Sequence, residues 1–314
     1  EVHHENPNQV EVYEEEFAGG GLRYEIEAFV KCINNPGVVK KITDEESIWL
    51  SGMMEQFLAN RGEVKQTVDT EALKRVGIWA HRGCSMMNPE NTLLAFKKAA
   101  ELEGITGIEF DVQLTKDGVM VIHHDYDLKR TCGVNKKIQD LTYRELCRYR
   151  LMGTKERIPR FIEVLREIDG KVPLLIELKM ETCNRKLCKK VAKALDRYRG
   201  LYCIECFHPY ALYWFKKNRP EVIRGQLSEQ FFKEKEAGSF SRKIAYFIMK
   251  NLLTNFITKP DFIAYRYKYK DCLPLKICRK FYKIPIYGWT FRDQKAYKEN
   301  EPYFEGFIFE KFVI

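Results

Sequence analysis

Two carboxylates, Glu109 and Asp111, stand two positions apart in an apolar run, and a histidine lies on either side of that run. On a β-strand this spacing places both side chains on one face of the sheet. Charged side chains seldom enter an apolar core without a function. Carboxylate oxygens bind hard cations, and histidines such as His81 and His124 can transfer protons near neutral pH. The stretch 80–125 therefore predicts a metal site with proton-transfer groups beside it.

The elements that must position these residues alternate along the chain from Val76 onward. Short apolar runs predict eight strands, at Val76–Ala80, Gly107–Leu114, Val119–His123, Pro173–Leu178, Tyr202–Phe207, Val222–Leu227, Asp261–Tyr265 and Pro285–Thr290. Apolar residues at helical spacing predict helices between most of them, at Asn91–Leu102, Thr142–Arg148, Phe161–Ile168, Asn184–Tyr198, Pro209–Lys217 and Leu273–Tyr282. Eight strands with helical crossovers predict an α/β fold, a (β/α)8 TIM barrel.

An open doubly wound sheet is the alternative to the barrel. The barrel is favoured because polar residues, among them His81, His124 and Glu177, fall at the carboxyl ends of predicted strands. Active sites of TIM barrels lie at that end of the strands.

The first sixty residues differ from the others in charge. Residues 1–62 contain 12 acidic and 5 basic side chains, whereas the remaining residues contain 32 acidic and 48 basic ones. We therefore expect an N-terminal appendage with a strand and helices over 1–62, a polar linker over 63–75 and a barrel domain over 76–314. A basic domain attracts anions such as phosphate esters or an anionic membrane surface. Because its basic residues are spread along helices, nucleic-acid binding is not expected.

Several classes of protein are disfavoured by the sequence. No apolar run approaches the roughly 18 residues that span a bilayer, and the polar, acidic start does not resemble a signal peptide. The ten cysteines form no framework. Cys203 and Cys206 form a C-x-x-C pattern in a strand-like run, but no second pair at zinc-ligand spacing accompanies them. These features predict a cytoplasmic protein with reduced cysteines.

Residues 1–62 resemble the C-terminal tail of glucose-fructose oxidoreductase-type dehydrogenases. The resemblance rests on the segments 21–29, 32–33 and 46–49. The segment contains neither a Gly-rich dinucleotide loop nor a catalytic Lys, so no oxidoreductase activity is expected from it. We interpret it as a docking appendage or a fusion remnant.

The barrel domain resembles the glycerophosphodiester phosphodiesterase family over residues 76–312. The resemblance rests on motifs in a fixed order: His81-Arg82-Gly83, Pro89-Glu90-Asn91-Thr92, Glu109-Phe110-Asp111, Thr115-Lys116-Asp117-Gly118, His123-His124-Asp125, Glu177-Leu178-Lys179 and Trp289-Thr290. It implies a TIM barrel, a divalent cation, and hydrolysis of a glycerophosphodiester to glycerol 3-phosphate and an alcohol.

The resemblance also assigns roles to individual side chains. Glu109, Asp111 and Glu177 offer the oxygen ligands that suit Mg²⁺ or Ca²⁺. His81 and His124 are expected to act as general acid and base, and the sequence does not say which is which. His123, one residue earlier, is expected to be structural because it would point the other way on a strand.

Four further residues are expected to bind the phosphate or to support the site. Arg82 and Lys179 would contact the phosphate, Arg82 with its planar fork and Lys179 as a point charge. Glu90 and Asn91 would hold Arg82 and His81 in place.

Three segments depart from the common pattern of the family. Cys206-Phe207 replaces Ser-Phe, Arg292 stands at the Asn position after Trp289, and the closing segment 306–311 lacks its Thr-Asp pair. We expect Trp289 to pack against the glycerol carbons, and none of the departures to touch the carboxylates or the two histidines. A more apolar rim makes lysophospholipase D-type activity on lipid-like diesters the first alternative. A non-catalytic barrel that binds phosphate or a partner is the second.

Residues 231–260 interleave apolar and basic side chains. A basic amphipathic helix in this segment would contact an anionic membrane surface peripherally. The alternative, which we favour from the sequence, is a barrel helix or lid that packs its apolar face on the sheet.

Overall fold

The computed structural model describes residues 2–3, 10–11, 77–83, 85, 88–234 and 240–312. The chain divides into two compact units, Glu1–Lys65 and Gln66–Ile314. In the first unit, strands β1 (Val2–His3) and β2 (Val10–Glu11) pair in antiparallel fashion. Our other predictions for residues 1–75 lie outside the described residues.

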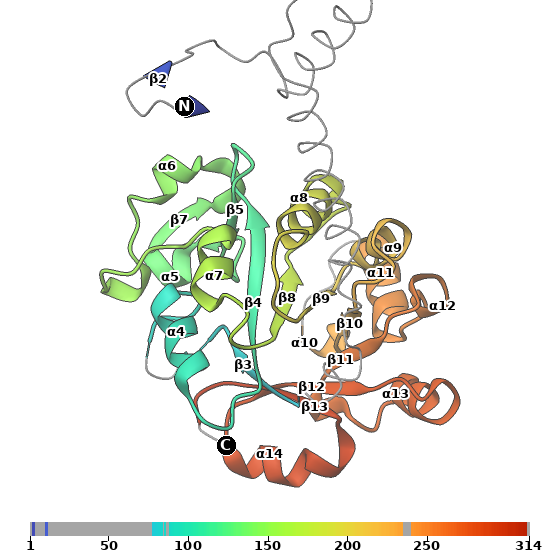
Figure 1. Ribbon diagram of the computed structural model, residues 1–314. Coiled ribbons are helices and arrows are strands. Elements are labelled where there is room, and N and C mark those ends of the chain that lie inside the picture. The colour runs from blue at the N-terminus through green and yellow to red at the C-terminus, as the bar shows by residue number, and fades with distance from the viewer. Residues whose placement is uncertain are drawn as a thin grey trace, which may run out of the picture. The chain divides into compact units, whose positions relative to one another are not determined.

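The second unit contains a closed barrel of parallel strands (Figure 1). Eight strands form it: β3 (Ile78–His81), β4 (Gly107–Leu114), β8 (Leu174–Leu178), β9 (Tyr202–Cys206), β10 (Arg224–Ser228), β11 (Phe262–Arg266), β12 (Ile286–Phe291) and β13 (Gly306–Phe309). Strand β3 pairs in parallel with both β4 and β13, which closes the sheet on itself. The prediction of a TIM barrel is confirmed.

One of our strand assignments was wrong, and one barrel strand was missed. The run Val119–His123 is not a barrel strand, because β5 (Met120–Ile122) folds back antiparallel on the end of β4. Lys116, Asp117 and Gly118 form the turn between them, since the Thr115 N–H donates to the Val119 carbonyl at 3.0 Å. A connection this short cannot join two parallel strands. The strand that completes the barrel is β13, which holds only four residues and was not assigned from the sequence.

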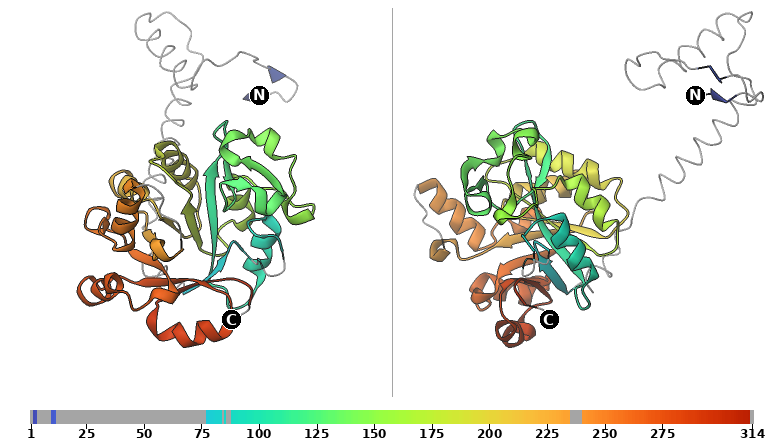
Figure 2. Two further views of the ribbon diagram at one scale, coloured as in Figure 1. Left: turned by 180° about the vertical axis from the view of Figure 1, so that it is seen from behind. Right: turned by 90° about the vertical axis from the view of Figure 1, so that its left-hand side faces the viewer.

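Helices form the outer layer around the strands (Figure 2). They include α4 (Leu93–Glu101), α7 (Phe161–Ile168), α8 (Arg185–Leu195), α9 (Pro209–Asn218), α13 (Leu273–Ile277) and α14 (Gln294–Asn300). Phe110 on β4 packs between Phe96 of α4 and Phe161 of α7, with ring centroids 5.4 and 6.0 Å away. Because side chains alternate along a strand, this outward position of Phe110 directs its neighbours Glu109 and Asp111 into the barrel interior.

Apolar side chains fill one part of the barrel interior. Trp79, Leu175, Phe262 and Tyr287 are buried there together, and the rings of Phe262 and Tyr287 stack at 4.7 Å. Gly225 makes this possible, since a Cβ on it would lie 2.1 Å from the Phe262 ring. The interior is therefore a packed core, and the polar residues stand toward the strands' carboxyl ends.

Between β4 and α7 the chain makes a small excursion with an apolar core of its own. It consists of β5, β6 (Asp127–Leu128), α5 (Lys129–Cys132), β7 (Val134–Lys137) and α6 (Tyr143–Leu146), with short 3-10 turns at Ile138–Asp140 and Leu151–Gly153. His124 follows β5 in this excursion. Its place is thus fixed by an antiparallel hairpin, and not by a third barrel strand as we expected.

The connection between β10 and β11 contains α10 (Phe231–Glu234), α11 (Phe240–Lys250) and α12 (Asn255–Thr258). None of the α11 side chains that the structure describes is fully buried. The favoured expectation, a barrel helix or lid that packs its apolar face on the sheet, stays a prediction for α11. Among the described residues, no helix has the length and apolar character needed to cross a membrane.

Candidate active site

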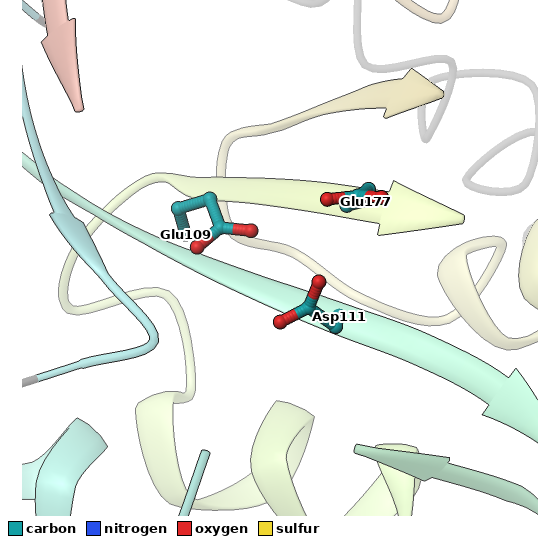
Figure 3. Close-up of side chains that lie close together, drawn as sticks. All are labelled: Glu109, Asp111 and Glu177. Carbon is teal, nitrogen blue, oxygen red and sulfur yellow. The ribbon is translucent and has the colours of Figure 1, made fainter. Parts of the chain in front are cut away.

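Strand register brings the three expected metal ligands together. Glu109 and Asp111 lie on one face of β4, and Asp111 is the register partner of Glu177 on the neighbouring strand β8. One carboxylate oxygen from each lies within 4.8 Å of the others. Figure 3 shows the three carboxylates converging from the two strands. All three are buried, so the site is built into the barrel and is not part of a solvated face.

The electrostatics of these carboxylates are unequal. Burial raises the pKa of Glu109 well above its ordinary value, and the charge of Asp111 adds to this effect. Burial also opposes ionisation of Asp111, but nearby His124 and Lys179 outweigh it and hold its pKa below the ordinary value. Buried oxygens that repel one another in this way are the ligand set expected for a hard cation such as Mg²⁺ or Ca²⁺. The Asp111 Oδ1 atom, which accepts no hydrogen bond within the described residues, fits the same interpretation.

Two cationic side chains stand against the carboxylates. The Lys179 Nζ atom lies 2.8 Å from Glu177 Oε1 and 3.5 Å from Asp111 Oδ1. Burial alone would lower the pKa of Lys179, but these two carboxylates outweigh it and hold the pKa above its ordinary value. The Arg82 Nε atom lies 3.6 Å from Asp111 Oδ2, and the Arg82 backbone N–H donates to Glu109 Oε2 at 3.0 Å. Both expected phosphate-binding residues thus lie beside the carboxylate cluster.

The turn after β3 shapes this part of the site. Arg82 has a positive φ of 56°, an uncommon conformation for a residue with a side chain. Gly83 follows with a φ of 80°, and a Cβ on it would lie 2.9 Å from the backbone of Ala95 on α4. The His-Arg-Gly motif therefore lets α4 approach closely while Arg82 turns back over the carboxylates.

His81 ends β3 and is the register partner of Glu109. Its Nδ1 atom lies 2.8 Å from Glu310 Oε2, just after β13, and its Nε2 atom lies 3.8 Å from Glu109 Oε2. Arg292 Nε in turn lies 2.5 Å from Glu310 Oε1. Burial lowers the pKa of His81 to about 4 and the charge of Arg82 adds to this, while Glu310 opposes it.

This contact corrects one of our expectations. Arg292 and Glu310 both lie in segments that depart from the family pattern, and we expected neither departure to touch the histidines. They form an ion pair that holds His81. Their partnership was not visible in the sequence because Arg292 follows β12 and Glu310 follows β13. Glu310 is 18 positions from Arg292 and 229 positions from His81.

His124 is held by a second carboxylate network. Its Nδ1 atom lies 2.6 Å from Asp125 Oδ1. Arg130 donates from Nε to Asp125 at 2.7 Å and, with its two terminal nitrogens, to both oxygens of Glu90. Glu90 also accepts a 2.8 Å hydrogen bond from Arg82. A continuous chain of charges therefore links the His124 loop to the turn after β3.

Both residues expected to support the site contact Arg82. Glu90 accepts a hydrogen bond from its guanidinium, and the Asn91 backbone N–H donates to the Arg82 carbonyl at 3.0 Å. The Asn91 Nδ2 atom also donates to Asp111 Oδ2 at 2.9 Å, and so it orients one of the carboxylates. His123 is buried between the Asp125 carbonyl and the Thr131 hydroxyl, at 2.8 Å from each, which agrees with a structural role.

Trp289 lies on β12, which is the seventh barrel strand and not the last one. Its ring contacts Phe207 edge-on at 5.7 Å, and the Arg266 guanidinium lies 5.9 Å from its centroid. Trp289 therefore belongs to an aromatic wall at the carboxyl end of β9 and β12.

One buried carboxyl group near the cluster was missed by sequence reasoning. Glu205 on β9 is the register partner of Glu177 and is 1% exposed. Burial raises its pKa well above the ordinary value, and the charges of Glu177 and Asp111 add to this. A signal was present, since Glu205 is a charged residue inside the apolar run 202–207, but the C-x-x-C pattern around it drew attention to the cysteines. Both Cys203 and Cys206 are free and buried.

Comparisons with known proteins agree with this geometry. The model of the glycerophosphoryl diester phosphodiesterase family matches residues 81–308. A glycerophosphodiester phosphodiesterase from Caldanaerobacter subterraneus is 37% identical over 159 residues, which make up 47% of this chain and 65% of that protein. A lysophospholipase D from Homo sapiens is 37% identical over 131 residues, or 38% of this chain and 40% of that protein. The chain thus spans less than two thirds of the length of these curated relatives.

A solved structure supports the same assignment. The glycerophosphodiester phosphodiesterase from Thermotoga maritima superposes with a TM-score of 0.58 and 28% identity, covering 74% of this chain and 94% of that one. The family model extends over well more than half of the sequence, and the matched residues include Glu109, Asp111 and Glu177. The chain therefore belongs to the glycerophosphoryl diester phosphodiesterase family.

Proposed function

We propose that this chain hydrolyses glycerophosphodiesters to glycerol 3-phosphate and an alcohol, with a divalent cation as cofactor. The observation that carries the proposal is the meeting of a buried carboxylate cluster with two histidines, each oriented through Nδ1 by its own carboxylate. An imidazole held in this way presents Nε2 for proton transfer. Lewis-acid neutralisation of phosphate oxygens is the chemistry that Mg²⁺ or Ca²⁺ supplies when bound to Glu109, Asp111 and Glu177.

The chain's own residues bind and orient the phosphate. Arg82 and Lys179 lie at the cluster and offer donors to the non-bridging oxygens of a phosphodiester. Asn91 fixes Asp111, and Glu90 fixes Arg82, so both charged groups are oriented before substrate enters. Trp289 offers an apolar face to the glycerol carbons.

The histidines divide the proton transfers between them. The low pKa of His81 makes it neutral at pH 7, and donation from Nδ1 to Glu310 leaves Nε2 as an acceptor. We assign His81 to accept the proton of the attacking hydroxyl or water. His124 is then the donor to the leaving alkoxide, which needs a proton because an alkoxide is a poor leaving group.

Removal of the cation should abolish the reaction. EDTA is expected to stop release of glycerol 3-phosphate from glycerophosphocholine, and Mg²⁺ or Ca²⁺ should restore it, as measured by a coupled glycerol 3-phosphate assay. Glu109→Gln should lower kcat/KM by more than about 100-fold, because neutralisation of the phosphate accounts for several kcal/mol of the barrier. The exposed Glu103→Gln is the control. Full activity of Glu109→Gln in EDTA would contradict the proposal.

The roles of the histidines can be separated with leaving groups of different basicity. The kcat of His124→Ala should fall about 10² to 10⁴-fold with glycerophosphocholine. It should fall much less with the nitrophenyl diester of glycerol phosphate, because the nitrophenolate leaving group needs no proton. His81→Ala should lose activity on both substrates. Steady-state kinetics on the two diesters would measure this, and the reverse pattern would exchange the two assignments.

The Glu310 contact predicts a change in the titration of His81. In the metal-free protein at pH 4, about half of the His81 side chains should be protonated, since burial holds the pKa at about 4. Glu310 raises this pKa, so Glu310→Gln should lower it and leave a smaller fraction protonated at the same pH. Imidazole ¹⁵N shifts of the folded protein measure the fraction. Glu299→Gln on α14 is the control, and an unchanged titration in Glu310→Gln would refute the contact.

We further propose that lipid-like diesters at an anionic membrane surface are substrates. A row of aromatic rings runs from Trp289 through Phe207 and Phe231 to Tyr246 on α11, with successive ring centroids 5.7, 6.0 and 5.0 Å apart. These rings form a continuous apolar surface that leads away from the site. Large apolar side chains are exposed on α10, α11 and α12 and in the turn between the last two helices, namely Phe232, Phe240, Ile244, Phe247, Leu253, Phe256 and Ile257. Residues 240–260 contain four basic and no acidic side chains. Such a surface suits anionic phospholipids.

Membrane contact has a direct test. The protein should sediment with phosphatidylglycerol vesicles at low salt and be released as salt screens the charges. Phe247→Asp should reduce binding by removing a 53% exposed ring and adding a negative charge. Met152→Asp, which changes an apolar side chain exposed to 47% outside this surface, is the matched control. Absence of binding at low salt would refute the membrane proposal, and a panel with and without an acyl chain would test the substrate class.

A further inference from the structure

Glu205 is a fourth carboxyl group on the interior face that carries the expected metal ligands. The register of β8 and β9 pairs Glu177 with Glu205, and neighbours in register on parallel strands point to the same side. The residues before and after it, Ile204 and Cys206, pack in the outer core with the helices. Glu205 therefore faces the barrel interior, on the strand beside Glu177.

The environment of Glu205 does not provide for its charge. Its side chain is 1% exposed, and its Oε2 atom accepts no hydrogen bond from the residues that the structure describes. Lys179 is committed to Glu177 and Asp111, at 2.8 and 3.5 Å. Arg82 is committed to Glu90 and Asp111, at 2.8 and 3.6 Å. An ionised carboxylate is unfavourable in such a place, which is why burial holds the pKa of Glu205 well above its ordinary value; a nearby cation would be needed to ionise it.

Charge counting shows which group would balance the site. The interior holds four carboxylates, Glu109, Asp111, Glu177 and Glu205, beside two cations, Arg82 and Lys179. Glu90 does not change this balance, because Arg130 holds both of its oxygens. With all four carboxyl groups ionised, two negative charges are left over among these six residues, which one divalent cation would neutralise. In the metal-free protein the raised pKa values of Glu109 and Glu205 favour their protonated forms instead.

We infer that Glu205 belongs to the cation site as a fourth carboxylate that strengthens cation binding through its charge. It does not join the three residues whose ligand atoms gather within 4.8 Å among the described residues. Glu205 therefore acts through its charge from the strand beside Glu177, and not as a fourth direct ligand. The inference rests on the cation site of the proposed function.

The test compares cation affinity in variants of the whole protein. Glu205→Gln keeps the shape of the side chain and removes its charge, so the dissociation constant for Mg²⁺ or Mn²⁺ should rise by about tenfold or more in calorimetric titration of the metal-free protein. Glu205→Asp keeps the charge and should stay closer to the native affinity. Glu229→Gln is the matched control, because Glu229 is also buried, at 2% exposure, but pairs with Arg266 at 3.2 Å and is not one of the residues of the carboxylate cluster.

The outcomes separate this inference from the proposed function. Native affinity in Glu205→Gln, or equal losses in Glu205→Gln and Glu205→Asp, would overturn the inference while leaving the metal site intact. Failure of the native protein to bind any divalent cation would overturn the proposed cation site itself. Thermal melting of each metal-free variant shows whether it is folded. If Glu205→Gln does not fold, Glu205→Met, which also removes the charge at similar volume, is titrated in its place.

Discussion

The structure depends on one constraint: three carboxylates of two neighbouring strands are buried side by side in the barrel. Ionised carboxyl groups are costly to bury unless charges and hydrogen-bond donors surround them. Lys179 and Arg82 supply these compensating charges. Both are close in sequence to other residues of the site, since Lys179 stands two residues after Glu177 and Arg82 one residue after His81. Strand register then places the paired charges in contact across β3, β4 and β8.

The supporting network extends this principle outward. Glu90 accepts from both Arg82 and Arg130, so a single carboxylate joins the turn after β3 to the excursion after β5. Through Arg130 and Asp125, that connection reaches His124. On the other side of the site, Arg292 and Glu310 join β12 and the end of β13 to His81. Each histidine is thus anchored by an arginine-backed carboxylate, which fixes its ring without using its second nitrogen.

The alternation of apolar strands and amphipathic helices in the sequence was enough to predict the barrel. It failed to assign individual strands where an apolar run was short or fitted two kinds of strand. The run 119–123 has the composition of a barrel strand, yet the Asp-Gly turn before it makes it the return strand of a hairpin. The strand 306–309 is too short to produce a clear pattern, and only its pairing with β3 and β12 identifies it. Helix α7 was predicted with its correct bounds because its apolar spacing is regular and its first turn contains a capping glutamate.

The sequence by itself was enough to predict the barrel class and the cluster of Glu109, Asp111 and Glu177, because these residues lie in short motifs whose spacing follows the strand repeat. It also indicated Arg82 and Lys179, since both adjoin those motifs. The catalytic roles of the two histidines stay predictions. The tertiary structure alone decided what touches them: Glu310 on His81, Asn91 on Asp111, and Glu205 beside Glu177. These contacts join distant strands, and their existence depends on register and barrel closure, which no local pattern encodes.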